Sequence, residues 1–355
     1  MIYGTPLGVH AVSCLPQSDT IVGVPLRVRG SHQCSLESVP YASGDSSYVL
    51  TIDGLTGLVG GEFAGTHYLK FNSGALEGRF FAITANSADT VTILNSDDLS
   101  GGLDSASPGD DLLIACFWTL DSLFPPDQAT TGWTESPAGS GNWKSNGHAV
   151  VASTGGSAFG RRSEILLPDC DSEGINLAPN QAYYIDSTSG DWESATGSAN
   201  AGGTILWPDT YLVIRHRPLV AHATKFKSGG EVEMGSFRIP LFTLATGFQD
   251  NFIALPRPVA LRLDELGLAG TEAFVSSLGA SVFGRRDQIL VFDNEAAHHN
   301  KSASEVYYHD GTNWVRSSDQ SVANDAILPA GDGFIIRKFR TSEGQTRFWA
   351  NPAPY

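Results

Sequence analysis

The sequence contains no run of about 18 apolar residues, the length that a helix needs to cross a bilayer, so we expect no membrane span. It has only 2 Met, few Lys and 17% charged residues, a composition that disfavours long amphipathic helices. The 4 cysteines form no CxxC pair and have no His at zinc spacing, which argues against a metal knuckle. These absences exclude a helical framework and a zinc-stabilised fold.

The cysteines and the net charge limit the crosslinks and the partners that we expect for this protein. Cys14, Cys34, Cys116 and Cys170 are either small buried residues or members of up to two disulfides, and the sequence does not choose among three full pairings. The formal net charge is −16 and the pI is about 4.8. A polyanionic surface repels phosphate backbones, so we expect no nucleic-acid partner.

The composition that is present favours strands and turns. There are 39 Gly and 18 Pro, and short apolar runs alternate with Ser, Thr, Asn and Asp, which is typical of many short strands joined by turns. A chain of 355 residues with 41% hydrophobic residues is long enough for two or three globular domains. We therefore expect an all-β protein.

One stretch of the sequence occurs twice without a gap. Residues 157–186 and 281–310 lie 124 positions apart and share 12 identities. Chance similarity does not keep an ungapped register over such a length, so we infer an internal duplication. The recurring residues are Ser157, Phe159, Gly160, Arg161, Arg162, Ile165, Leu166, Asp169, Asn176, Tyr183, Tyr184 and Asp186, which return as Ser281, Phe283, Gly284, Arg285, Arg286, Ile289, Leu290, Asp293, Asn300, Tyr307, Tyr308 and Asp310.

The two copies extend beyond this stretch and differ by one long insertion. Trp192 aligns with Trp314 after a turn that is two residues shorter in the second copy. Near the head of each copy the separation falls from 231 to 143, so the first copy carries about 88 residues that the second lacks. The further equivalent segments are 204–216 with 326–338, 19–28 with 250–259, and 119–123 with 262–266.

The insertion has the pattern of a small barrel, since short strand candidates follow one another between turn residues. We expect two related sandwich-like units, the first interrupted by a small inserted β-barrel-like domain. The strand candidates are 47–54, 67–74, 78–86, 89–95 and 110–118. The expected domains are 1–46 plus 118–248 for the first unit, 47–117 for the inserted domain, and 249–355 for the second unit.

Several phrases of the sequence resemble a family of uncharacterised exported proteins that occurs as multiple paralogues in Verrucomicrobia. The resemblance implies export to the cell surface or medium, a β-rich fold and no catalytic residue that could be carried over. The first residues, MIYGTPLGVHAV, lack the basic start and long apolar run of a leader. The chain is therefore either cytoplasmic, with a native Met1, or exported, with Met1 in place of a removed leader, and the second interpretation is favoured. The matching phrases are VGVP at 22–25, SGALEGRFFAITAN at 73–86, WTLDSLFP at 118–125, YYID at 183–186, TILWPDTYLVIR at 204–215, DNFIALP at 250–256, YYHDGTNWV at 307–315 and AILPAGDGFIIRK at 326–338.

One loop has the residue types of a calcium site. Asp169, Asp171 and Glu173 alternate before Gly174, loosely like a calcium-binding loop. The second copy replaces this stretch with DNEAAHHN, so a polar turn after a strand is the favoured interpretation. We expect no cofactor, with calcium as the alternative.

The recurring arginines and aromatic residues also have two interpretations. The pairs Arg161 with Arg162 and Arg285 with Arg286 could hold an anionic glycan or a partner's carboxylates. A structural role is favoured, in salt bridges to Asp169 and Asp293 or to other acidic residues of the chain. Adjacent tyrosines face opposite sides of a strand, so we expect one of each pair in the core and the other at the surface. Core packing is favoured over sugar stacking for the recurring aromatic residues, which are Tyr183, Tyr184, Trp192, Tyr307, Tyr308 and Trp314.

Three other tryptophans are the better candidates for contact with a glycan or a partner. Trp133 and Trp143 flank a glycine-rich hairpin tip, and Trp349 lies close to the end of the chain. We expect all three to be exposed, because glycine-rich and terminal segments lie at the surface.

No motif in the sequence predicts catalysis. There is no nucleophile elbow, HExxH or Walker loop, whereas 38 acidic residues can always supply a carboxylate pair. We expect a non-enzymatic exported structural or surface protein that assembles with itself, as a filament, lattice or appendage subunit, or with cell-surface components. A carbohydrate-binding surface module is the alternative, and a glycoside-active enzyme is less favoured.

Overall fold

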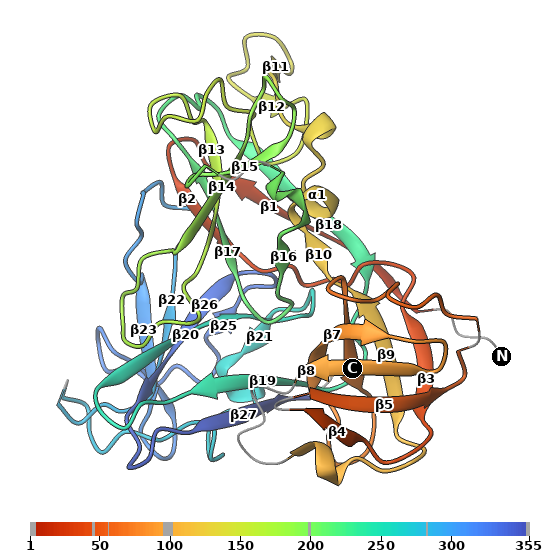
Figure 1. Ribbon diagram of the computed structural model, residues 1–355. Helices are drawn as coiled ribbons and strands as arrows, with labels where there is room; N and C mark the ends of the chain where they lie inside the picture. Colours follow the sequence, from red (N-terminus) through yellow and green to blue (C-terminus); the bar gives the residue numbers. More distant parts are fainter. Residues whose placement is uncertain are drawn as a thin grey trace.

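The computed structural model describes residues 5–44, 47–55, 57–94, 102–197, 200–281 and 283–352, and nearly all of their regular structure is β (Figure 1). The expected all-β class is confirmed. The α-helix in the described residues, α1 (Leu120–Leu123), has four residues, and no helix among them is long and apolar enough to cross a membrane. The short 3₁₀ helices are η1 (Gly102–Ser105), η2 (Pro126–Gln128), η3 (Ala201–Gly203) and η4 (Leu263–Glu265).

The inserted domain is a closed six-stranded barrel, and all five expected strands are present in it. The barrel begins earlier than residue 47, because β3 pairs with both β9 and β5 and so closes the barrel. Residue 95, the end of one strand candidate, lies outside the described residues. In order around the barrel the strands are β3 (His32–Leu36), β9 (Asp111–Cys116), β6 (His67–Phe71), β7 (Phe80–Asn86), β8 (Thr90–Leu94) and β5 (Ser47–Asp53), with β4 (Tyr41–Gly44) paired to β5.

Each duplicated unit is built on a five-stranded antiparallel sheet, and equivalent strands have the same order in both. The register is also the same: Ile165 lies opposite Tyr183 and Ile214, and Ile289 lies opposite Tyr307 and Ile336. The first sheet is β2 (Asp19–Val22), β17 (Leu212–His216), β13 (Ser163–Leu167), β14 (Gln181–Ile185) and β15 (Trp192–Ser194). The second is β20 (Phe248–Ala254), β26 (Gly333–Phe339), β22 (Gln288–Val291), β23 (Glu305–His309) and β24 (Trp314–Arg316).

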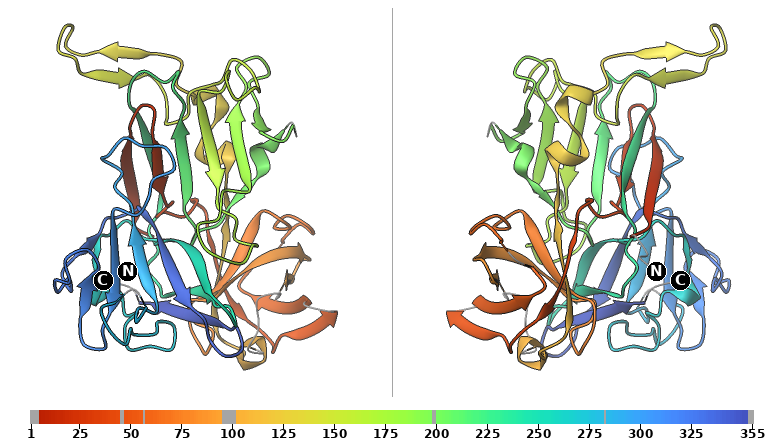
Figure 2. Two further views of the ribbon diagram at one scale, coloured as in Figure 1. Left: turned by 90° about the vertical axis from the view of Figure 1, so that its left-hand side faces the viewer. Right: turned by 90° about the vertical axis from the view of Figure 1, so that its right-hand side faces the viewer.

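Two-stranded ladders complete each sandwich, and they too are found in both units. A separate hairpin, β11 (Trp133–Glu135) with β12 (Trp143–Ser145), projects from the end of the first unit (Figure 2). In the first unit the ladders are β1 (Leu7–Cys14) with β18 (Thr224–Glu231) and β10 (Trp118–Thr119) with β16 (Ile205–Leu206). In the second they are β19 (Phe237–Phe242) with β27 (Thr346–Asn351) and β21 (Leu261–Arg262) with β25 (Ile327–Leu328).

Both faces of the five-stranded sheets are covered, which explains why their strands read as unbroken apolar runs. Ile165 and Ile214 point into the core of the first unit. Their neighbours Leu166 and Val213 point to the other face and pack against Leu290 and the rest of the second sheet. The two units therefore meet sheet to sheet through residues at equivalent positions.

Candidate functional site

The contact between the two units is built on two ion pairs, one within each unit, and an asparagine of the opposite unit completes each pair. Arg215 on β17 donates two hydrogen bonds of 2.7 Å to Asp19 on β2 within the first unit. Asn300 of the second unit completes the group, since its side-chain oxygen accepts from Arg215 at 2.6 Å and its backbone N–H donates to Asp19 at 2.7 Å. The hydrogen bonds that Arg215 donates to Asp19 raise the pKa of the Arg215 guanidinium.

The equivalent residues form the same arrangement with the roles of the two units exchanged. Arg337 pairs with Asp250 at 2.7 and 3.0 Å, while Asn176 of the first unit accepts from Arg337 at 2.9 Å and donates to Asp250 at 2.8 Å. Both asparagines have positive φ, 56° for Asn176 and 49° for Asn300, a conformation that Asn tolerates better than most residues. One chain thus has the contact pattern of a two-fold symmetric dimer.

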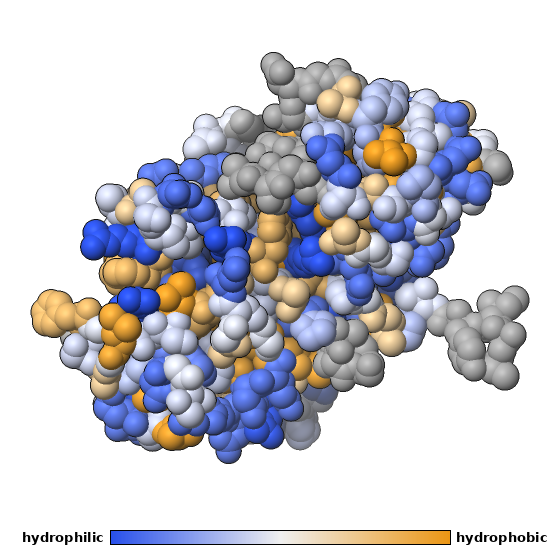
Figure 3. All heavy atoms as spheres, turned by 90° about the horizontal axis from the view of Figure 1, so that it is seen from below, coloured by the Kyte–Doolittle hydropathy of each residue, from blue (hydrophilic) through white to orange (hydrophobic). Residues whose placement is uncertain are grey.

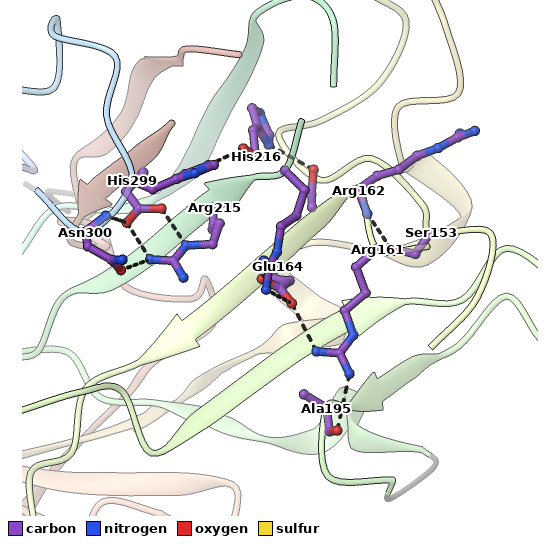
Figure 4. A network of polar contacts seen from close by, with 12 residues as sticks. Ser153, Arg161, Arg162, Glu164, Ala195, Arg215, His216, His299 and Asn300 are labelled. Carbon is purple, nitrogen blue, oxygen red and sulfur yellow. Dashed lines mark hydrogen bonds and ion pairs between the residues drawn. The ribbon is translucent and has the colours of Figure 1, made fainter. Parts of the chain in front are cut away.

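A buried polar cluster lies behind this contact in the first unit (Figure 4). His216 bonds the Ser163 hydroxyl at 2.9 Å and the Thr224 hydroxyl at 2.7 Å, and burial lowers the pKa of His216 to about 4. The Glu164 carboxylate accepts from Arg161 and Arg217. Each of these groups is engaged by the protein itself, which assigns them to the stability of the fold.

The recurring segment that precedes β13 and β22 forms a tight turn in both units. We name residues 157–162 and 281–286 the FGRR turns; residue 282 is not among the described residues. In the first turn the Ser157 carbonyl accepts from Arg161 N–H at 3.1 Å, and the Ser157 hydroxyl accepts from Gly160 N–H at 3.2 Å. The second turn repeats both bonds. The hydroxyl bond explains why Ser recurs in both turns, whereas Gly and the first Arg contribute their backbone N–H groups.

The first arginine of each turn holds the neighbouring strand. Arg161 lies 5.0 Å from the centre of the Tyr184 ring and Arg285 lies 5.2 Å from that of Tyr308, both by cation–π contact. The favoured structural role fits this contact, and Arg161 forms its salt bridge with Glu164, an acidic residue other than Asp169. The expectation that one tyrosine of each pair is exposed is wrong, since the arginine covers it. All four tyrosines of the two pairs are buried: Tyr183, Tyr184, Tyr307 and Tyr308.

In each turn, two recurring residues have side chains that take no part in the cores or ion pairs of the described residues. The side chains of Phe159 and Phe283 are 94% and 100% exposed. Arg162 and Arg286 use their backbone N–H groups to bond Ser153 and Ser277, but their guanidinium groups make no ion pair with any described residue. Figure 4 shows the Arg162 side chain pointing away from the other labelled residues. The duplication has kept a free aromatic ring and a free cation at equivalent surface positions.

The tryptophans divide into core and surface residues. Trp192 and Trp314 are buried in the cores of the two units, as favoured from the sequence. Trp143 is 42% exposed and stacks on His222 with ring centres 4.4 Å apart, and Trp133 is half-buried against the same ring. The expected exposure of Trp349 is wrong: it is fully buried and donates to the Leu266 carbonyl, because β27 pairs with β19 and closes the second core.

The candidate calcium loop is a hydrogen-bonded turn. Asp169 accepts from the backbone N–H groups of Asp171 and Ser172 at 3.3 and 3.1 Å, and Asp293 accepts equivalent bonds in the second copy. Asp171 and Glu173 point to solvent. Within the described ranges, no group of three or more His, Cys, Asp or Glu residues could hold a metal ion.

All four cysteines are free in the structure. Cys14 and Cys34 are buried, Cys116 is half-buried, and Cys170 lies at the surface beside the loop of Asp171. Burial raises the pKa of Cys14 to about 11, so its thiol stays protonated at neutral pH. The cysteines therefore serve as small side chains and not as crosslinks in this structure.

Comparisons of the chain with models of protein families, with curated proteins and with solved structures found no match. Any assignment of function must therefore come from the geometry. The distribution of hydrophobic residues on the surface does not by itself mark a site, since the face in Figure 3 shows them in separate groups among hydrophilic ones. What distinguishes the FGRR turns is their repetition.

The sequence alone did not identify the residues that join the units. Asp19, Asp250, Arg215 and Arg337 each recur at an equivalent position, and this recurrence was the available signal. Their partners are more distant: the Asn300 N–H that reaches Asp19 lies 281 residues away in the sequence. Only the tertiary arrangement brings these groups together.

Proposed function

We propose that this chain is a non-enzymatic structural or surface subunit that assembles with copies of itself outside the cell. The observation that carries this proposal is the pair of exposed phenylalanines, Phe159 and Phe283. Each lies near an arginine whose guanidinium group forms no ion pair with the described part of the chain. Single exposed apolar residues are ordinary on protein surfaces. These two occupy equivalent positions in a duplicated fold that does not use them for packing, which favours a function in contact.

The charge of the protein indicates what the turns contact. The chain carries a net charge of −16, so a cationic turn with an aromatic tip is complementary to the surface of another copy. Two turns on one chain make each subunit bivalent, which allows assembly to continue beyond a dimer. The extracellular or cell-surface location rests on the resemblance to exported proteins described above.

The test is the assembly state of the purified protein as its concentration is raised. Sedimentation velocity and negative-stain electron microscopy should show oligomers that grow with concentration for the wild type. The double variant Phe159→Ser with Phe283→Ser should remain monomeric, since each buried Phe contributes about 1.5–3 kcal/mol of contact energy. Leu219→Ser is the matched control, because Leu219 is 58% exposed and does not belong to either turn. Assembly that is equal in both variants would refute the proposal.

A carbohydrate-binding surface is the second candidate, favoured by the geometry of the projecting hairpin. Trp143 presents a partly exposed ring that is held in place by the stacked His222, with the edge of Trp133 against the same imidazole. A fixed aromatic ring at the surface is suited to stacking on the apolar face of a sugar. Binding on a glycan array that is lost in Trp143→Ala, and kept in Trp207→Ala, would establish it; Trp207 is 45% exposed on a different segment.

A further inference from the structure

A pocket of about 430 Å³ opens between the loop that follows β13 and the end of the second unit. Its lining combines carboxylates with apolar side chains: Asp171, Glu173 and Asp209 on one side, Phe242 and Leu244 on the other. Phe242 is 40% exposed, so an aromatic ring can reach it. We name this feature the acidic pocket.

The acidic pocket is held open by hydrogen bonds between the two units. The Gly174 N–H donates to the side-chain oxygen of Gln249 at 2.8 Å, and the Gln249 amide nitrogen donates to the Ser172 carbonyl at 3.3 Å. Thr346 is also in the lining, but its hydroxyl oxygen is buried and has no hydrogen-bond partner among the described residues. The hydrogen bonds between the units therefore shape the pocket before any partner binds.

The pocket breaks the internal symmetry of the molecule. Gly331 is the equivalent of Asp209 in the second copy. There the His10 ring from β1 lies so close that a Cβ on Gly331 would be 2.3 Å from its Nε2 atom. At this position the second copy packs His10 against the backbone, whereas in the first copy Asp209 lines the pocket.

We propose that the acidic pocket of one copy receives the first FGRR turn of the next copy, with the Phe159 ring against Phe242 and Arg162 against Asp171 and Glu173. This inference rests on the proposed function and names the surface that assembly uses. The turn precedes β13 and the pocket loop follows β13, so donor and acceptor lie at opposite ends of the same strand. Such a head-to-tail contact is heterologous and generates an open chain or a ring.

The size of the contact determines its strength. A six-residue turn covers only part of the roughly 800 Å² per partner that stable interfaces bury. One such contact is therefore weak, and assembly depends on protein concentration. This agrees with a structural subunit that polymerises when it is locally abundant.

The native Cys170 provides a direct test, because it lines the acidic pocket. In full-length protein carrying Cys116→Ser, the substitution Ala158→Cys places a thiol next to Phe159 in the turn. Mild oxidation under assembling conditions should produce a ladder of covalent oligomers, with peptide mapping that joins position 158 to Cys170. The same protein with Cys170→Ser is the control and should give no ladder.

A charge exchange tests the same contact without a crosslink. Arg162→Glu and Asp171→Arg should each raise the concentration needed for assembly by about tenfold or more, and combining them should restore it. If the wild type assembles but no link to Cys170 forms and the exchange has no effect, the docking is refuted while the proposed function stands, and the pocket must bind something else. If the wild type stays monomeric at every concentration, both are refuted.

Discussion

Replacing Asp19 or Asp250 with Asn should destabilise the protein by nearly the same amount, because the two carboxylates are equivalent. Each accepts two hydrogen bonds from an arginine and one from the backbone of the opposite unit. Removing one partner of a buried ion pair costs about 3–5 kcal/mol. The arginines, Arg215 and Arg337, remain 16% and 17% exposed, so we expect a loss of about 2–4 kcal/mol per substitution.

The assay is urea unfolding of the wild type and of each single variant at one protein concentration. Asp264→Asn is the control, since Arg262 and Asp264 form a surface pair that is 46% and 40% exposed and contributes less than about 1 kcal/mol. The account requires that both variants lose stability and that the two losses agree within about 1 kcal/mol. A large loss in one and none in the other would show that the two units are not joined by equivalent contacts.

Three further predictions concern stability. Burial lowers the pKa of His216 to about 4. The stability that the neutral imidazole contributes is therefore complete above about pH 6.5 and falls by up to about 3 kcal/mol as the pH drops toward 4. In unfolding experiments at a series of pH values, His216→Gln should make this fall smaller. Burial raises the pKa of Asp332 to about 6. The stability that its protonated carboxyl group contributes is present at low pH and is lost as the pH rises through 6. Asp332→Asn should therefore stabilise the protein at pH 7 by about 1–2 kcal/mol, and a variant less stable than the wild type would contradict this. In urea unfolding, Trp349→Ala should lower the free energy of unfolding by about 3–5 kcal/mol and Trp143→Ala by less than about 1, because only the Trp349 ring is fully buried. Equal losses would contradict the difference in burial between the two rings.

The duplication could be predicted from the sequence because both copies face the same packing constraints. Trp192 and Trp314 fill equivalent positions in the two cores, and neither can change without leaving a cavity. The barrel strands could also be located, because each strand is bounded by turn residues. The start of the barrel was missed because β3, HQCSL, begins with two exposed polar residues and has no apolar run.

The remaining features depend on contacts between distant segments. Trp349 lies near the end of the chain, which usually predicts exposure, but its strand pairs with β19 and seals a core. The contact between the units joins asparagines to carboxylates of the other copy, and no local pattern encodes that pairing. The recurring Phe159 and Phe283 were visible in the sequence, yet only their exposure in the folded chain separates them from core residues.

The measurement that most directly tests the central claim is the assembly state of the unmodified protein, followed by sedimentation velocity from low to high concentration. The account predicts oligomers that increase with concentration and disappear in the Phe159→Ser, Phe283→Ser variant. A wild-type protein that remains a monomer throughout that range would contradict it, and the exposed turns would then need another explanation.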